Sequence, residues 1–283
     1  MPDASSSPRP RLLTPAFLAI SVAVLAYFTA DGITLPIAPR YAAGPLGADP
    51  FGVGLAMGAF SLSALLLRPL AGRLADRRGR RPLLVGGALL FAAAMLGHLV
   101  ANTLPLLIVM RLLLGVAEAF VFVAALAAIA DMAPEARRGE AISFFSLSLY
   151  LGIAFGPTIG ETALGTDRYW LVWIVAAGMA LAAAVLGGRV PETRAPEPAG
   201  GAIRSTAIIH PAGVLPGIAV FGGVWGMAGF FVFLPLHALD LGFDGARLFL
   251  TVFAVVVVGS RIVGARAPDR FGARRLSGAA LLF

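Results

Sequence analysis

RPLAGRLADRRGRR at residues 68–81 and RIVGARAPDRFGAR at residues 261–274 align without gaps and decide the fold of this chain. Six positions are identical in the two copies: Arg68/Arg261, Arg73/Arg266, Asp76/Asp269, Arg77/Arg270, Gly79/Gly272 and Arg81/Arg274. Each copy follows the second apolar segment of its part of the sequence. Self-similarity at a long period is the sequence signature of a repeated structural unit. The chain is therefore expected to contain two related halves.

The composition around these stretches is that of a membrane protein. Of the 283 residues, 59% are hydrophobic and 13% are charged, and the mean hydropathy is +0.88. A soluble domain has about 45–50% apolar and about 25% charged residues. Because apolar runs of helix length repeat along nearly the whole chain, we expect an all-α polytopic membrane protein with no soluble domain.

The apolar runs define the expected domain organisation. Residues 1–13 form a polar tail, residues 14–188 a bundle of six transmembrane helices, residues 189–211 a flexible cytoplasmic linker rich in Pro, Gly and charge, and residues 212–283 a partial second bundle. The expected spans lie at about 15–39, 51–72, 83–101, 104–130, 141–163, 169–188, 212–237 and 246–265. SGAALLF at the end of the chain resembles the start of a ninth span.

The arginines predict the direction of these spans. The formal charge is +7, and all 22 basic residues are Arg. Most of them lie in alternate turns, and Arg40, Arg168 and Arg247 lie in the turns between. Because positive loops stay inside, this asymmetry predicts a cytoplasmic N-terminus. The basic charge is explained by topology, and we expect no nucleic-acid partner.

Several kinds of chemistry are disfavoured by what the sequence lacks. Without Lys there is no P-loop and no pyridoxal-phosphate Schiff base, and without Cys there is no thiolate metal site. His98, His210 and His237 are too scattered for a metal motif. GVGLAMG at 52–58 has the wrong spacing for a nucleotide fingerprint. We expect no enzyme, no cofactor and no metal.

Four motifs give the chain a family resemblance. GRLADRRGRRPLL at 72–84 is similar to the signature loop between spans two and three of the major facilitator superfamily. VMRLLLGVAEA and DMAPEARRGEA resemble the two ends of its fourth span, and GIAFGPTIGE at 152–161 resembles an element of its exporters. DGITLPIAPRY is similar to the end of the first span in the drug-export families, with one residue fewer before Pro36. The resemblance covers nearly the whole chain and points to the bacterial drug:proton antiporter branch.

The resemblance implies the major facilitator fold: a complete N-terminal six-helix bundle followed by about two and a half helices of the C-terminal bundle. It also implies a multi-pass protein of the bacterial inner membrane that exports a small molecule in exchange for protons. Two six-span halves need roughly 400 residues, so we interpret the chain as C-terminally truncated or as a partial gene model. The complete form is expected to be a monomer.

The loop after the second span has the features of a cytoplasmic gate. Gly72 is expected to let two helices approach, and Gly79 to permit a tight turn. The predicted gating residues are Gly72, Asp76, Arg77, Gly79, Arg80, Arg81 and Asp131, with Asp131 pairing with Arg77 or Arg80 and the pairs latching the outward-facing state. In the second copy the corresponding residues are Asp269, Arg270 and Gly272. The alternative is an arginine cluster that only sets topology.

Among the charged residues within spans, where each costs about 2.5–3.5 kcal/mol, Asp31, Arg111 and Glu118 lie deepest. At 1.5 Å per residue, Asp31 and Arg111 lie about 12 Å and about 10 Å below the outer surface. Glu118 is two turns beyond Arg111 on the same face. We predict that Asp31 and Glu118 exchange protons and that Arg111 is their switchable counter-ion; the alternative is a static ion pair. Glu161 is expected to be a solvated end charge, and Arg68 and Arg261 are expected to snorkel to the cytoplasmic interface.

The remaining candidates concern packing and substrate. Gly152, Gly156, Pro157 and Gly160 have the spacing of a tight helix contact, and Pro157 is also a candidate kink at a gate. Aromatic residues suit lipophilic or cationic substrates, and Tyr27, Tyr150, Trp225 and Phe230 are predicted to line a central cavity. The alternative is that they face lipid or neighbouring helices.

The sequence therefore predicts a secondary active transporter that exports a small, drug-like or metabolite molecule by alternating access. Two alternatives stay open. One is proton-coupled uptake or sugar-type efflux by the same fold, and the other is a membrane receptor or scaffold that binds a ligand without moving it.

Overall fold

The computed structural model describes residues 12–194, 211–243 and 245–264, with only part of the side chains in the last two helices. Its elements are α1 (Pro15–Ala43), α2 (Pro50–Arg78), α3 (Arg80–Gly97), α4 (Leu104–Met132), α5 (Arg138–Leu164), α6 (Tyr169–Gly188), α7 (Pro211–Asp240) and α8 (Arg247–Gly264), with 3₁₀ turns at His98–Val100 and Glu135–Arg137. No strand occurs in the described ranges. The all-α fold class predicted from the sequence is confirmed. The expected start of a ninth helix lies outside the described residues.

The first six helices are long and apolar enough to cross a membrane, by length and composition. Shorter apolar helices occupy Gly229–Asp240 and Leu248–Ser260. Apolar side chains lie on all sides of the first six helices, as expected for helices that cross a membrane.

Local signals fix where the helices begin and end. Thr14 caps α1 by accepting a hydrogen bond from Phe17 N at 3.2 Å, and Asp49 caps α2 by accepting one from Gly52 N at 2.8 Å. A proline follows each cap in the first helical position, where its missing N–H costs nothing. A single residue, Gly79 with φ +104°, separates α2 from α3. The prediction that Gly79 permits a tight turn is thus confirmed, since side-chain-bearing residues rarely adopt this conformation.

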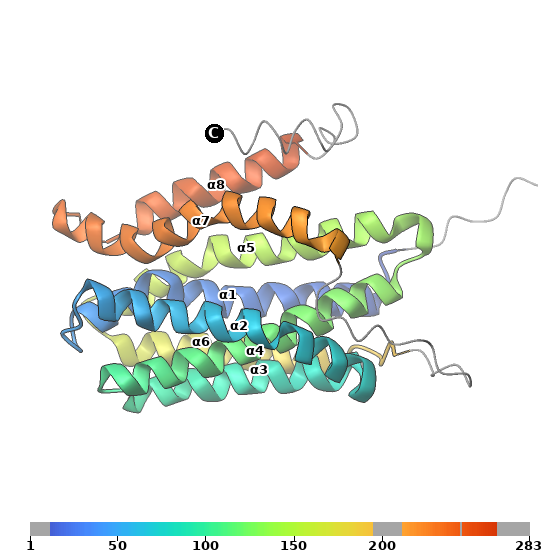
Figure 1. Ribbon diagram of the computed structural model, residues 1–283, viewed down its shortest axis with the longest axis horizontal. Coiled ribbons are helices and arrows are strands. Elements are labelled where there is room, and N and C mark those ends of the chain that lie inside the picture. Colours follow the sequence, from blue (N-terminus) through green and yellow to red (C-terminus); the bar gives the residue numbers. More distant parts are fainter. Residues whose placement is uncertain (1–11, 195–210, 244, 265–283) are drawn as a thin grey trace, which may run out of the picture.

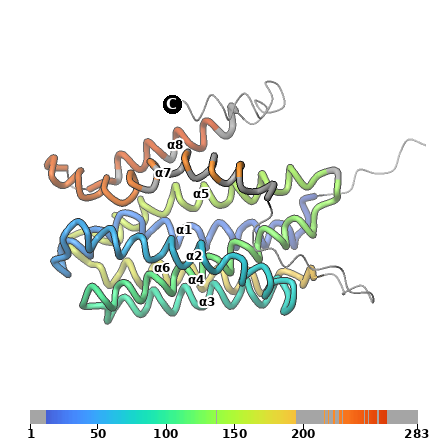
Figure 2. Tube along the Cα trace, in the orientation of Figure 1, coloured from blue at the N-terminus to red at the C-terminus, as the bar shows by residue number. Residues whose placement is uncertain are grey.

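Helix α1 lies inside the bundle and packs against α5 and α6. Helix α2 packs on α4, and α3 packs on both α4 and α6. Figures 1 and 2 show the last two helices stacked over α5 on one side of the bundle, where α8 contacts α5 and α7 contacts α1.

The interior consists of two apolar clusters. The larger one runs through α1, α3, α4 and α6 and contains many alanines, which let the helices approach closely. The smaller one lies near the α1–α2 turn, where Ala38, Val53 and Leu107 are buried and Val232 and Leu236 of α7 pack against them. The second cluster joins α7 to the first six helices.

The two ends of the bundle differ in charge and are named here for reference. The Arg-rich end carries Arg77, Arg78, Arg80 and Arg81 at the α2–α3 turn. The Glu161 end carries the α1–α2, α5–α6 and α7–α8 turns, with Arg40 and Glu161 between them. In Figure 1 the Arg-rich end lies to the right and the Glu161 end to the left.

Candidate functional site

Three charged residues are buried inside the bundle. Asp31 on α1 is 9% exposed, and Arg111 and Glu118 on α4 are 5% and 7% exposed. These are the three residues that the sequence predicts for proton exchange. An ion in such surroundings needs a partner, because removing it from water is costly.

Glu118 finds its partner on another helix. Its Oε1 atom accepts a hydrogen bond from Arg68 Nη2 of α2 at 3.2 Å. The guanidinium carbon of Arg68 also lies 4.6 Å from the centre of the Phe122 ring, within the range of a cation–π contact. The sequence had assigned Arg68 to the cytoplasmic interface and Arg111 to Glu118. The correction follows from helix rotation, since α2 packs against α4 and directs Arg68 toward Glu118.

Arg111 is left with a different set of neighbours. Its guanidinium carbon lies 4.8 Å from the centre of the Phe60 ring, and its Nε and Nη1 atoms are buried without a hydrogen-bond partner. Asp31 is close enough to Arg111 for a coulombic interaction. The described residues show no hydrogen bond between these two side chains. The buried charges thus form two units, Glu118 with Arg68 and Asp31 near Arg111.

A glycine contact between α1 and α5 holds the Asp31 region in place. A Cβ atom on Gly152 would lie 2.7 Å from Thr29 N, and one on Gly156 would collide with the backbone of Gly32. Gly160 faces Ile33 in the same way, and Pro157 is buried beside it. The helices meet backbone to backbone because these positions lack side chains. The predicted packing role of this series is therefore present in the structure.

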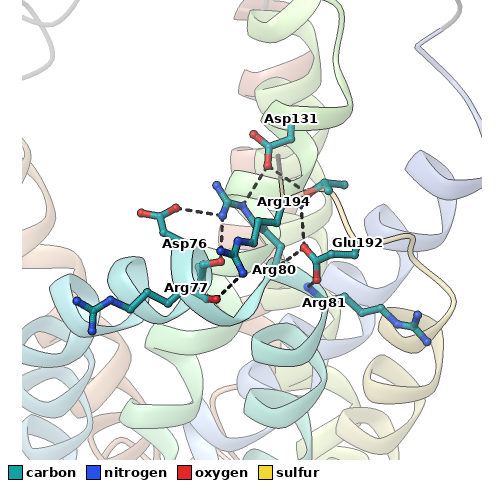
Figure 3. A network of polar contacts seen from close by, with 9 residues as sticks. Asp76, Arg77, Arg80, Arg81, Asp131, Glu192 and Arg194 are labelled. Carbon is teal, nitrogen blue, oxygen red and sulfur yellow. Dashed lines mark hydrogen bonds and ion pairs between the residues drawn. The ribbon is translucent and has the colours of Figure 1, made fainter. Parts of the chain in front are cut away.

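The Arg-rich end holds a polar network centred on Arg80 (Figure 3). Arg80 pairs with Asp76 at 3.0 Å and with Asp131 of α4 at 3.1 Å. Its Nη1 atom also donates to the backbone carbonyl of Ala75 at 2.9 Å. Of the two arginines predicted to pair with Asp131, the structure selects Arg80 and not Arg77.

Residues 190–194 complete this network. The Glu192 carboxylate accepts hydrogen bonds from Arg80 N at 2.8 Å and Arg81 N at 3.1 Å, the first backbone amides of α3. Arg194 Nη1 donates to the carbonyl of Arg77 at 2.6 Å, at the end of α2. An anion at a helix N-terminus and a cation at a helix C-terminus are both favourable. Although burial by itself raises it, the backbone hydrogen bonds lower the pKa of Glu192 below its ordinary value.

The Glu161 end carries a buried ion pair. Arg40 Nη1 of α1 lies 2.9 Å from Glu161 Oε2 of α5, and the two side chains are 13% and 8% exposed. Glu161 Oε1 also accepts from Ala246 N, at the start of α8, at 3.4 Å. The prediction of a solvated charge at Glu161 is therefore wrong, because α5 extends to Leu164 and the α7–α8 turn covers the carboxylate.

Some predicted site residues do not lie where the sequence placed them. Around Gly72 there is open space, so the expected close approach is absent from this structure. The buried face of α2 carries Ala71 and Ala75, and Gly72 lies about 100° further around the helix. Asp269, Arg270 and Gly272 lie outside the described residues.

The predicted cavity residues have different environments. Tyr27 is fully buried, with its ring edge-on to Phe28 and Phe91, so it lies in the packed core and not on an open cavity. Phe230 is half-buried and stacks with Phe231 and with Phe253 of α8. Tyr150 is half-buried on α5. The Trp225 side chain lies outside the described residues.

The sequence also passed over several residues that the structure brings into the site. In the sequence, Arg40 contributes only to the prediction of helix direction, and Glu192 falls within the predicted flexible linker. Two signals were available for them: Arg40 lies at the same end as Glu161, and Glu192 is an acidic residue within reach of an arginine-rich turn. Among the described residues, no group of three or more His, Cys, Asp or Glu could hold a metal ion.

Comparison with known proteins agrees with this architecture. The multidrug resistance protein 1 of Bacillus subtilis is 31% identical over 175 residues, which are 62% of this chain and 42% of that protein. The staphylopine export protein of Staphylococcus aureus is 29% identical over 87% of this chain and 64% of its own length. A solved bacterial homologue of the human lysosomal transporter Spinster, in an inward-facing and unoccupied conformation, superposes with a TM-score of 0.71 at 17% identity over 92% of this chain and 63% of that chain.

The chain spans less than two thirds of the length of each of these three proteins. The sequence description of the Major Facilitator Superfamily matches residues 20–283, which is nearly the whole chain. The repeat, the six apolar helices and the four motifs are all consistent with this match. The chain belongs to the Major Facilitator Superfamily of membrane transporters.

Proposed function

We propose that the protein is a secondary active transporter that exports a small molecule in exchange for protons by alternating access. The observation that carries this proposal is the set of buried charges within the membrane helices, Asp31, Arg111 and Glu118. Ionisable residues in membrane spans are rare and mark ion or proton pathways. A scaffold that only binds a ligand has no need of them.

The direction of transport is inferred from sequence motifs and relatives. The glycine and proline series from Gly152 to Gly160 resembles the exporter element, and two relatives carry the names multidrug resistance protein and export protein. These names describe those proteins, and they favour efflux over uptake for this one. The transported compound is expected to be drug-like or a metabolite.

In this mechanism Asp31 and Glu118 bind and release protons while the bundle changes its open side. Protonation removes the negative charge of a carboxylate, so the nearby arginine loses its electrostatic partner. Arg111 then serves as the counter-ion that Asp31 regains when its proton leaves. A cationic or polar substrate competes with the proton for the same carboxylates, which couples the two movements.

The Arg-rich end is proposed to be the cytoplasmic gate. Under the positive-inside rule its arginines face the cytoplasm, so the N-terminus is proposed to lie inside. The family match supports a location in the bacterial inner membrane. Asp76, Arg80 and Asp131 form pairs that break and reform as the gate moves, and the second copy at Asp269, Arg270 and Gly272 provides the matching element. Asp76→Arg is expected to impair transport while membrane insertion stays intact. The complete transporter is proposed to act as a monomer, with no cofactor.

The proposal is tested with the complete product of the gene. A drug and metabolite susceptibility screen on a deletion and overexpression pair identifies the exported class. Everted membrane vesicles loaded with a pH-sensitive dye then report proton movement when that compound is added. We expect Asp31→Asn to abolish the substrate-dependent proton signal, with Asp49→Asn, which changes an exposed helix cap, as the control. Efflux that stays proton-driven in Asp31→Asn would contradict the role of Asp31.

A further inference from the structure

The ion pair between Arg68 and Glu118 is the buried contact that the proposed mechanism does not yet use. The Glu118 side chain is 9% exposed, whereas that of Arg68 is 44% exposed. One end of the pair thus lies in the packed interior and the other end reaches the surface. The exposed end of the pair lies on α2.

The two oxygens of the Glu118 carboxylate have different surroundings. Glu118 Oε1 accepts the hydrogen bond from Arg68, whereas Oε2 is buried without a hydrogen-bond partner. In such a place the negative charge of a carboxylate is stabilised only by its cationic contact. Phe122, one turn beyond Glu118 on α4, holds the guanidinium over the carboxylate through its ring face.

Arg111 is the other cation on α4, and the structure directs it elsewhere. It lies two turns from Glu118, contacts the Phe60 ring, and interacts electrostatically with Asp31. No hydrogen bond between Arg111 and Glu118 occurs among the described residues. Each buried carboxylate thus has its own arginine, on a different helix from itself.

The ionisable groups around Glu118 come from several helices. Helix α1 contributes Tyr27 and Asp31, which both interact electrostatically with Glu118. Helix α2 contributes Arg68, and α4 itself contributes Arg111. The charged residues of α3 and α5 lie at helix ends. There the pairs are Arg80 with Asp131, Arg137 with Glu140 and Arg40 with Glu161. Helix α5 also has the ionisable Tyr150 near its middle. Among these groups, Arg68 is the one cation bonded to Glu118.

We propose that Arg68 is the positioning residue that controls proton entry to Glu118 from the Arg-rich end. A proton from water bonds to a carboxylate oxygen of Glu118 and leaves a neutral carboxylic acid. Arg68 keeps its charge, loses its ionic partner and moves away from Glu118 on its exposed side. When the proton leaves, the carboxylate draws Arg68 back. The inference rests on the proposed proton coupling, and it adds a second, separately controlled carboxylate to it.

Infrared difference spectroscopy of the purified, full chain tests this directly. The carboxylic acid C=O band of Glu118 is identified by its loss in Glu118→Gln, and its intensity is followed against pH. In Arg68→Met we expect the titration midpoint to rise by about one pH unit or more, a tenfold gain in proton affinity, because the stabilising cation is gone. Arg68→Lys should restore most of the original midpoint. Arg73→Met, which removes an exposed arginine of the same helix, should leave it unchanged.

Further variants separate this role from a structural one. Arg111→Met should move the band of Asp31, identified by Asp31→Asn, and move that of Glu118 by much less. Phe122→Leu keeps the charge but removes the ring contact, so it should raise the Glu118 midpoint by a smaller amount, and it tests the proposal if Arg68→Met does not fold. The proposal is overturned if neither Arg68→Met nor Phe122→Leu moves the midpoint, or if Arg111→Met moves it as far. The C=O band of Glu118 is measured without any transport. If the complete protein showed no proton coupling in vesicles, that would contradict the proposed function, but the effect of Arg68 on the Glu118 midpoint would still stand.

Discussion

Both ends of the bundle contain ion pairs between arginine and a carboxylate, but the pairs differ in how deeply they are buried. At the Glu161 end a single pair, Arg40 with Glu161, is nearly buried and is capped by the start of α8. At the Arg-rich end Asp76, Asp131 and Glu192 are exposed, and Arg80 joins them in a network. Burial decides how much it costs to break each contact, because water screens an exposed pair, whereas a buried ion that loses its partner is strongly destabilising.

The ends also differ in what they connect. The Glu161 end joins α1 and α5 to the α7–α8 turn, and Val232 and Leu236 of α7 pack against the small apolar cluster beside it. Among the described residues, the network of the Arg-rich end stays within α2, α3, α4 and residues 190–194. The contacts of the Glu161 end thus join α7 and α8 to the first six helices, whereas those of the Arg-rich end join only elements of the first six helices and the segment after them.

The buried pair should show the largest effect on stability. Glu161→Gln leaves the Arg40 guanidinium buried without a negative partner, so we expect a loss of about 3 kcal/mol in the free energy of unfolding. Thermal unfolding of the detergent-solubilised protein measures it. Glu140→Gln, which breaks an exposed ion pair at the start of the same helix, is the control and should lower the midpoint far less. The double variant Arg40→Met/Glu161→Met should recover much of the stability that Glu161→Gln loses, because it leaves no buried charge unpaired. Equal unfolding midpoints for Glu161→Gln and Glu140→Gln would contradict the claim that the buried pair is the more costly one to break.

The glycine contact beneath the pair should rank second. Gly156→Ala places a Cβ against the Gly32 backbone and pushes α1 away from α5, with an expected cost of about 2 kcal/mol from overpacking. The same unfolding assay applies. Gly178→Ala on α6, where the added Cβ meets open space, is the matched control. If both alanines behave alike, the close approach of α1 and α5 does not contribute as described.

The exposed network should respond less. Asp131→Asn removes one of the two carboxylates that pair with Arg80, and we expect a loss below about 1 kcal/mol because water screens the interaction. Adding salt to the wild-type protein should reproduce part of this loss, whereas the Glu161 pair should be less sensitive to salt. An Asp131→Asn effect as large as that of Glu161→Gln would show that burial is not the deciding factor.

The smallest effect is expected at Glu192 and depends on pH. Because its pKa is lowered in the folded protein, its contribution is fully present above the ordinary glutamate value of about 4.3 and is lost as pH falls through the lowered value. The unfolding midpoints of wild type and Glu192→Gln should therefore differ slightly near pH 7 and converge as the pH falls through the lowered pKa of Glu192. Glu135→Gln, which changes an exposed carboxylate nearby, serves as the control. A difference that grows on acidification would be contrary to this account.

The general architecture could be predicted from the sequence because a membrane leaves few choices. A long apolar run must satisfy its backbone polar groups within itself, so it forms a helix. Gly79 was predictable as a turn residue, and Asp131 could be assigned to Arg77 or Arg80 because both helix ends meet at one surface. These features depend on local sequence and on the alternation of helix direction.

The pairing of buried charges could not be predicted in the same way. Whether Glu118 meets Arg111 of its own helix or Arg68 of α2 depends on how α2 and α4 are rotated, and apolar side chains on all sides of a helix do not reveal that rotation. Glu161 was placed at the boundary by counting residues, which cannot show that the α7–α8 turn covers it. Glu192 lies in a segment with the prolines and glycines typical of a linker, and its role depends on an α3 terminus that is distant in sequence.

The Glu192 contact has a consequence for how the chain is made. Glu192 follows α6, whereas the α3 amides that it binds are synthesised much earlier. The α2–α3 turn therefore enters the membrane surface without its carboxylate and stays incomplete while α4, α5 and α6 are inserted. Only when the ribosome has passed residue 194 can Arg194 and Glu192 bind the two helix ends. The contact thus depends on the order of synthesis. It can form only after all of the first six helices have been synthesised.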